Sequence, residues 1–218
     1  MNEVPFARLP GYGRLLSLYR SKGDGYILAW GQRISGLLLV FYVLLHINTL
    51  ASLTDPEAFA SKAQMFSSPV FVFAEWLLAL PVIFHCLNGS RLLFYELFTT
   101  RFDRSLRGWV YLLTLTYMIL LGHLMIRGNQ QVSAHLFWLL VLLGAGFISF
   151  ILVDRIRNGP GSFSWKLHRI TAAMLFLLVP AHMLFMHLNP EVGRNVSIIV
   201  ERMGQPLILV VDALLLCC

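Results

Sequence analysis

Three histidines lie well inside long apolar stretches of this 218-residue chain: His46, His85 and His182. Ionisable side chains are costly in such surroundings and are functional candidates by default. Imidazoles that face one another across a helical bundle bind haem iron from both sides, a role for which hydroxyl, Cys and Met side chains are less suited. The alternative is a histidine that packs against a neighbouring helix and hydrogen-bonds to it. The three residues therefore predict a haem site, with structural packing as the competing interpretation.

The surroundings of two of these histidines repeat along the chain. An arginine precedes each histidine by thirteen residues: Arg33 stands in the segment Q-R-I-S-G at 32–36, and Arg169 in H-R-I-T-A at 168–172. Later features keep the same register: Asp55-Pro56-Glu57 with Asn189-Pro190-Glu191, Ser68-Pro69 with Gln205-Pro206, and Glu75 with Asp212. Such a long register indicates an internal duplication. His85 lies sixteen residues after Pro69, so the second copy predicts a histidine at position 222, four residues beyond Cys218.

The composition places these residues in a membrane. Hydrophobic residues make up 57% of the chain and charged residues only 13%, which is too few charges to cover a water-facing surface. A soluble globular enzyme is therefore excluded. A spanning helix needs about 20 largely apolar residues, and five stretches of this kind precede a shorter apolar run at 206–218: 28–50, 70–94, 109–126, 134–153 and 170–188. We predict an all-α integral membrane bundle with five full transmembrane helices and a short or truncated C-terminal helix.

The chain is predicted to form a single membrane domain over residues 1–218. Residues 26–102 hold the first repeat with helices I and II, 103–163 the intervening helices, and 164–218 the second, incomplete repeat. Residues 1–27 are polar and basic, and we expect them to remain as an aqueous segment. The tryptophans, Trp138 among them, are expected to face lipid or the membrane interface.

The Lys and Arg residues are distributed unevenly between the two sides of the bundle. Eleven lie in the N-terminal segment, the loop after the second span and the loop before the fifth, which share one side. Four lie on the other side: Lys62, Arg127, Arg194 and Arg202. The positive-inside rule then places the N-terminus in the cytoplasm. We expect a multi-pass protein of the cytoplasmic (inner) membrane. Anionic lipid or an acidic cytoplasmic partner accounts for the net charge of +6, so no nucleic acid is needed.

Depth in the membrane decides which histidines can share an iron. His46 lies about five residues from the outer end of its span and His182 about seven, so at a rise of 1.5 Å per residue their depths differ by only ~3 Å. We predict that they bind one haem near the outer face. His85 lies six residues before Arg91, towards the cytoplasm, and is assigned to a second, inner haem. His123, near the outer end of its span, is a further candidate metal ligand.

Charged residues near these histidines are the remaining candidates. Arg33, Arg169 and Arg91 are predicted to pair with haem propionates or to hydrogen-bond to a quinone. In the alternative interpretation, these arginines extend their charged ends to the membrane interface and serve as ordinary anchors. Glu75 and Asp212 lie in apolar surroundings, where a charge is costly, and are candidates for proton transfer or for bonding to neighbouring groups.

These motifs together resemble a known family. The segment H-C-L-N-G-S-R at 85–91 looks like the H-x-x-x-G-x-R motif on the second helix of the membrane anchor of succinate:quinone oxidoreductases. Residues 33–36 and 168–171 are similar to that anchor's H-R-x-[ST]-G motif, and 55–59 (D-P-E-A-F) matches its first outer loop. A histidine thirteen residues after the arginine is similar to the two-haem, single-chain form shared by succinate dehydrogenases and quinol:fumarate reductases.

The resemblance implies a cytochrome b anchor with two b haems, which works with menaquinone or another quinone. It implies flavoprotein and iron–sulfur partner subunits on the cytoplasmic side, so this chain would be the non-catalytic, electron-transfer subunit of the enzyme. His46 and His182 match the ligands of the outer haem, and His85 matches one ligand of the inner haem. Four residues fall on motif positions that lie near a quinone or the haem propionates in relatives: Arg33, Ser35, His168 and Arg169.

The sequence departs from the family pattern where Gln32 replaces a histidine and Ala172 replaces a glycine. Two other functions stay open: the cytochrome b subunit of a hydrogenase or formate dehydrogenase, and a proton-coupled transporter. The parallel orientation of the two copies argues against a transporter. The spans also lack the breaks that open a transport site, apart from Pro81 and Pro180.

Overall fold

A computed structural model of the chain describes residues 11–98, 103–128, 132–190 and 194–217. These residues form eight α-helices and one short 3₁₀ helix, and no strand occurs among them. The helices are α1 (Gly11–Ala51), η2 (Ser52–Thr54), α2 (Pro56–Phe66), α3 (Pro69–Phe98), α4 (Asp103–Arg127), α5 (Ala134–Ile156), α6 (Phe163–Leu188), α7 (Val196–Met203) and α8 (Pro206–Cys217). Some residues used in the predictions lie outside the described residues: Arg8, Arg101, Glu191 and Cys218.

Within the described part of the chain, five helical segments are long and apolar enough to cross a membrane: Gly23–Thr54, Pro69–Phe98, Asp103–Arg127, Ala134–Ile156 and Phe163–Leu188. The predicted all-α fold with five full spans and a short C-terminal helix is therefore confirmed. Two spans begin before their apolar stretch because polar residues stabilise the first turn. Asp103 puts a negative charge at the N-terminus of α4, and the hydroxyl of Ser162 accepts a hydrogen bond from the Trp165 N–H at the start of α6.

The helix α1 contains two segments that meet at Gly23. This glycine has φ 73° and ψ 176°, a backbone conformation that side chains disfavour. The sequence analysis treated the first 27 residues as an aqueous segment and did not predict that 11–22 are helical.

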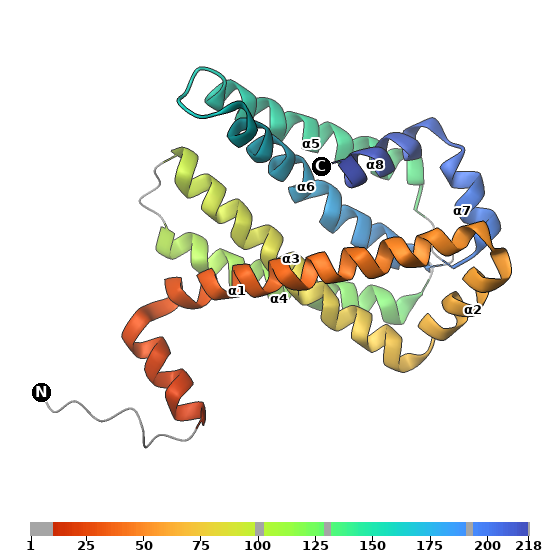
Figure 1. Cartoon of the computed structure of the whole chain (residues 1–218), viewed down its shortest axis with the longest axis horizontal. Coiled ribbons are helices and arrows are strands. Elements are labelled where there is room, and N and C mark those ends of the chain that lie inside the picture. The colour runs from red at the N-terminus through yellow and green to blue at the C-terminus, as the bar shows by residue number, and fades with distance from the viewer. Residues whose placement is uncertain (1–10, 99–102, 129–131, 191–193, 218) are drawn as a thin grey trace, which may run out of the picture.

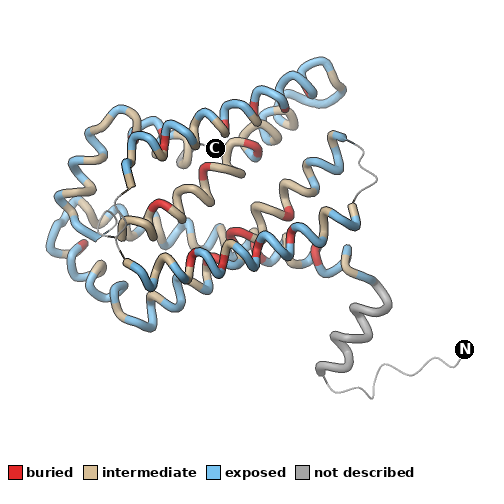
Figure 2. Tube along the Cα trace, turned by 180° about the vertical axis from the view of Figure 1, so that it is seen from behind, coloured by how far each residue is buried: buried red, intermediate tan, exposed pale blue. Residues whose placement is uncertain are grey.

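The helices α3 and α6 form the centre of the bundle. They contact each other and both contact α4, while α3 also packs against α1 and α6 against α5. The helix α8 packs against α5 and α6, and Figure 1 shows these three helices lying together. Figure 2 shows exposed residues along the outer sides of the helices. Many of them are large and apolar, which fits contact with lipid.

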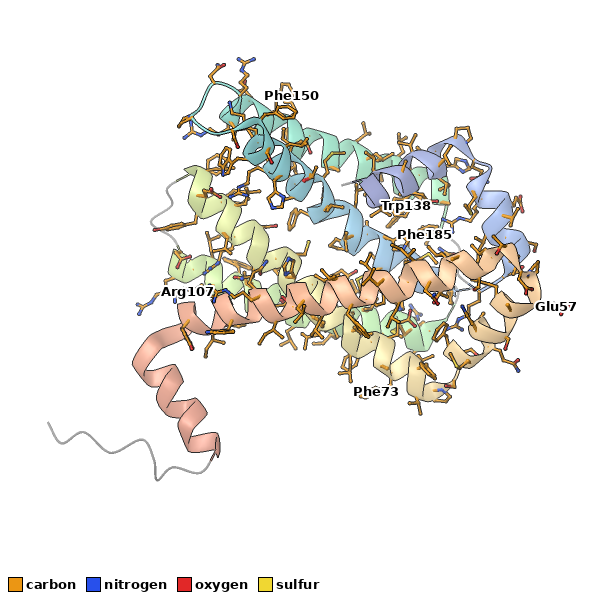
Figure 3. The ribbon with its side chains drawn as sticks, in the orientation of Figure 1. Glu57, Phe73, Arg107, Trp138, Phe150 and Phe185 are labelled. Carbon is orange, nitrogen blue, oxygen red and sulfur yellow. The ribbon has the colours of Figure 1, made fainter. Side chains whose placement is uncertain are left out.

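The largest core cluster joins α5, α6 and α8: Trp138, Ala145, Leu178, Phe185, Ile208 and Val211. Figure 3 shows Trp138 and Phe185 in this part of the bundle, with ring centroids 5.5 Å apart. The side chain of Trp138 is only 2% exposed, so the expectation that it faces lipid or the interface is wrong. The reason is that α8 covers this face of α5.

A long helix, a short helix and a helix that begins at a proline occur twice in the same order. The first set is α1, α2 and α3, and the second is α6, α7 and α8. Asp55 caps α2 by accepting hydrogen bonds from the backbone N–H groups of Glu57 and Ala58, and Asn195 caps α7 through Ser197. This recurrence supports a duplication of the helix pair.

Candidate functional site

His46 of α1 and His182 of α6 face each other across the bundle. Their ring centroids are 6.4 Å apart, and the ring planes are inclined by 81°. Bonds from metal ions to imidazole nitrogens are about 2 Å long, so two imidazoles on opposite sides of one metal ion have ring centroids roughly 6 Å apart. The spacing of this outer pair therefore fits the two axial positions of a haem iron.

Aromatic side chains lie against both members of the outer pair. Tyr42, one turn before His46 on α1, stacks on it with ring centroids 5.7 Å apart. The ring of Trp138 lies 6.5 Å from that of His182, and the Trp138 Nε1 is buried without a hydrogen-bond partner in the described part of the chain. A buried N–H without a partner raises the free energy of the folded protein, so it is a donor that a bound polar group can satisfy.

Glu75, a predicted proton carrier, lies on α3 near the outer pair. It is close enough to His46 to act on it electrostatically, and its Oε1 is 3.6 Å from Nε2 of His187 on α6. Nδ1 of His187 donates to the backbone carbonyl of Met183 at 2.7 Å. Since Nδ1 carries a proton, any further proton on the pair lies on Nε2 or on the carboxylate. His187 was not among the predicted site residues.

Arg202 of α7 is a second charged residue near the outer pair. Its guanidinium carbon lies 5.1 Å from the ring centroid of Phe185, and it is close enough to His182 to act on it electrostatically. Burial lowers the pKa of the Arg202 guanidinium, and the carboxylate of Asp212, the other predicted proton carrier, opposes this shift. The sequence analysis counted Arg202 only among the outer loop charges, because only the fold brings α7 to this position.

His85 of α3 faces α1. Its Nδ1 lies 3.1 Å from the backbone carbonyl oxygen of Gln32 and 3.1 Å from Oγ of Ser35. A carbonyl oxygen only accepts hydrogen bonds, so Nδ1 carries the proton and Nε2 keeps its lone pair. Metal-binding histidines are held in the same way, with the second nitrogen donating to a backbone carbonyl or a carboxylate. The arrangement therefore fits a histidine that offers Nε2 to a metal.

The position at which Gln32 replaces a motif histidine belongs to a buried hydrogen-bond network. Asn88 of α3 is fully buried, and its Nδ2 donates to Oε1 of Gln32 at 2.8 Å and to the backbone carbonyl of Leu28 at 3.3 Å. Nε2 of Gln32 donates to the backbone carbonyl of His85 at 3.2 Å. The sequence analysis assigned neither amide a role. An asparagine inside an apolar span was the available signal, since it needs a buried partner.

Two of the predicted arginines are engaged in ion pairs where α3 ends and α4 and α6 begin. Arg91, whose side chain is 9% exposed, lies 3.2 Å from the carboxylate of Asp103. Arg169 donates to both carboxylate oxygens of Glu96, at 3.0 and 2.9 Å. A quinone or a haem propionate that binds these arginines must compete with the carboxylates of Asp103 and Glu96.

The other polar candidates lie on exposed surfaces. Arg33 is exposed, with its guanidinium carbon 5.4 Å from the ring centroid of Trp30. His168 and His123 are exposed on α6 and α4. Among the described residues no group of three or more His, Cys, Asp or Glu side chains is placed to hold a metal ion. The pair of His46 and His182 is therefore not part of a metal site built from protein ligands alone.

Comparison with known proteins identifies the family. The profile of the family described as succinate dehydrogenase/fumarate reductase transmembrane subunit matches residues 12–124. The chain belongs to this family. It is 30% identical over 82 residues to the succinate dehydrogenase 2 membrane subunit SdhC of Mycobacterium tuberculosis, in an alignment that covers 37% of this chain and 59% of the relative. No solved structure matches the chain.

Membership in this family, together with the five apolar helices, establishes a multi-pass membrane protein. The matched residues contain α2, α3 and most of α1 and α4, and with them His46, His85 and Ser35. His182 and Arg202 lie beyond the matched residues. The second member of the outer pair is therefore supported by the geometry of this chain and not by the family match.

Proposed function

We propose that this chain is the haem b-containing membrane anchor of a succinate dehydrogenase or quinol:fumarate reductase complex. It lies in the cytoplasmic (inner) membrane with its N-terminus in the cytoplasm. It passes electrons between menaquinone, or another quinone, and an iron–sulfur subunit, which binds with a flavoprotein subunit on the cytoplasmic side. The facing pair of His46 and His182 carries this proposal, because family membership alone leaves open whether a member binds haem.

The residues of the chain hold the cofactor and tune it. Haem, when bound, supplies a one-electron carrier whose potential depends on its ligands, nearby hydrogen bonds and nearby charges. His46 and His182 would hold an outer haem through their imidazole nitrogens. His85 offers Nε2 to a second, inner haem, and Ser35 with the Gln32 carbonyl holds His85 in the required tautomer.

The acidic residues near the outer pair manage protons in this proposal. Glu75 and His187 offer a carboxylate oxygen and Nε2, 3.6 Å apart, as acceptors for a proton, because the Nδ1–H of His187 is occupied by the Met183 carbonyl. A quinol that is oxidised nearby must release protons, and this pair provides a place for one of them. Asp212 beside Arg202 is the second candidate. Residues assigned to the quinone or the haem propionates remain Arg33, Ser35, Arg91, His168 and Arg169.

Purification of the chain with its soluble partner subunits, followed by a pyridine haemochrome assay, tests the proposal. We expect a b-type spectrum and two haems per chain. His46→Ala and His182→Ala should each remove the same haem, so the double variant loses no more than either single variant. His85→Ala should remove the other haem.

Exposed histidines provide the controls for this assay. His135→Ala, at the start of α5, should keep both haems. His123→Ala tests the remaining histidine candidate, and we expect it to keep both as well. A colourless preparation that still holds the flavoprotein and iron–sulfur subunits would overturn the assignment of haem to this chain.

A further inference from the structure

We propose that Tyr117 of α4 and Cys86 of α3 form a clamp on the Pro180 turn of α6, and that this clamp sets the orientation of His182. Proline has no backbone N–H, so the carbonyl of Phe176, four residues earlier, lacks its helical partner. The thiol of Cys86 donates to that carbonyl at 3.5 Å. The hydroxyl of Tyr117 donates to the carbonyl of Pro180 itself at 2.6 Å. Two neighbouring helices thus each supply a hydrogen-bond donor to the Pro180 turn.

The Pro180 turn matters because His182 lies two residues after Pro180. An interior proline kinks a helix, and the angle of the kink determines the direction of the turn that follows. No water competes for the freed carbonyl at membrane depth, so the protein must supply the donors. The position of the His182 ring, 6.4 Å from that of His46, therefore depends on how the Pro180 turn is held.

Packing fixes Tyr117 independently of its hydrogen bond. Its ring lies against the core cluster of Ala79, Met118 and Leu121, and Met183 packs against the same cluster. Tyr117 therefore holds α6 before His182, through Pro180, and the cluster that supports Tyr117 contacts α6 after His182, through Met183. The turn of α6 that carries His182 is thus held at both ends.

The inference rests on the proposed function, because it concerns the plane of an axial ligand. The planes of His46 and His182 are nearly perpendicular, at 81°. Perpendicular imidazole planes leave the iron orbitals that overlap them close in energy, which makes the low-spin EPR signal strongly anisotropic. Tyr117 and Cys86 act through the Pro180 turn, so they are positioning residues. Their loss should let the rings turn towards parallel and move the low-field g value of the outer haem downward.

Tyr117→Phe tests the clamp because it removes one hydroxyl and keeps the ring. We expect two haems per chain, a lower low-field g value for the outer haem, and a shifted midpoint potential for that haem alone. Tyr111→Phe is the matched control, since Tyr111 lies on the same helix with an exposed side chain. Pro180→Ala restores the backbone N–H and the regular helix, so it should move the same EPR line further. Cys86→Ala should move it less.

The outcomes separate this inference from the proposed function. A Tyr117→Phe protein with both haems and an unshifted outer line overturns the clamp and leaves haem binding intact. A wild-type complex without haem overturns the proposed function instead. If Tyr117→Phe loses haem, Cys86→Ala and Pro180→Ala decide the matter: a shifted line in either supports the clamp, and unshifted lines in both overturn it.

Discussion

Gly36→Ala tests the contact between α1 and His85, because the structure defines what an added methyl group would meet. A Cβ at residue 36 would lie 3.0 Å from Cε1 of His85. This contact is tighter than ordinary van der Waals contact between carbon atoms, so the imidazole must retreat by a few tenths of an ångström. The two Nδ1 contacts, both 3.1 Å at present, would then lengthen towards the roughly 3.5 Å at which a hydrogen bond is lost.

The magnitude follows from these contacts. Nδ1 of His85 has a single proton, which the Gln32 carbonyl and the Ser35 hydroxyl share. Leaving this N–H without a partner costs about 1–3 kcal/mol, while replacing a helical glycine by alanine stabilises by about 1 kcal/mol. The free energy of unfolding should therefore fall by about 0–2 kcal/mol. The effect on metal binding is larger, because loss of the groups that orient a metal-binding histidine typically weakens metal affinity about 10–100-fold. The inner haem is the one that should be lost.

Gly146→Ala is the matched control, because a Cβ at that position on α5 would meet nothing within 4 Å. Haem per chain is measured by pyridine haemochrome after dilution and washing, and stability by unfolding with SDS in mixed micelles. We expect Gly36→Ala to lose about half of its haem while Gly146→Ala keeps it and is at least as stable as the wild type. Equal haem contents and equal unfolding free energies in the two variants would refute the contact between α1 and His85.

Three further predictions follow from the buried and charged groups. Asn88→Ala removes two buried hydrogen bonds to α1 and should lower the free energy of unfolding by about 1–3 kcal/mol in SDS titrations; an unchanged value would contradict the network. Arg202→Gln removes a positive charge near the outer pair and should lower the midpoint potential of the outer haem in redox titrations, whereas Arg194→Gln should not. Glu75→Gln and His187→Gln should each slow quinol turnover, and a double variant slower than both would show that they do not act as one unit.

The membrane fold could be predicted from sequence because the bilayer leaves few alternatives. An apolar stretch of about 20 residues must satisfy its backbone internally, so it becomes a helix wherever it occurs. The ends of the helices were harder to predict, since Asp103 and Ser162 extend α4 and α6 beyond the apolar stretch. Burial was also hard to predict. Protein and lipid neighbours are equally apolar, and this explains why Trp138 was wrongly expected to face lipid or the interface.

Depth along a helix was enough to predict that His46 and His182 lie close to each other, whereas their role as haem ligands stays a prediction. His46 and His182 occupy matching positions in two copies of one pattern, and the structure brings their rings together. The partners of His85 could not be predicted in this way, because they depend on how closely α1 lies against α3. The same is true of the clamp on Pro180, whose donors come from two helices that are distant in sequence.

One turn of α3 is connected to both candidate haem ligand regions. His85 faces α1, and the next residue, Cys86, reaches the carbonyl of Phe176 on α6. Adjacent helical residues point about 100° apart, so a single rigid turn contacts two neighbours at once. A displacement of α3 at His85 must therefore also displace the support of the Pro180 turn and, through it, His182. In the proposed electron path, the relative positions of the inner and outer ligands are thus held by one helix and its direct contacts, without the involvement of a loop.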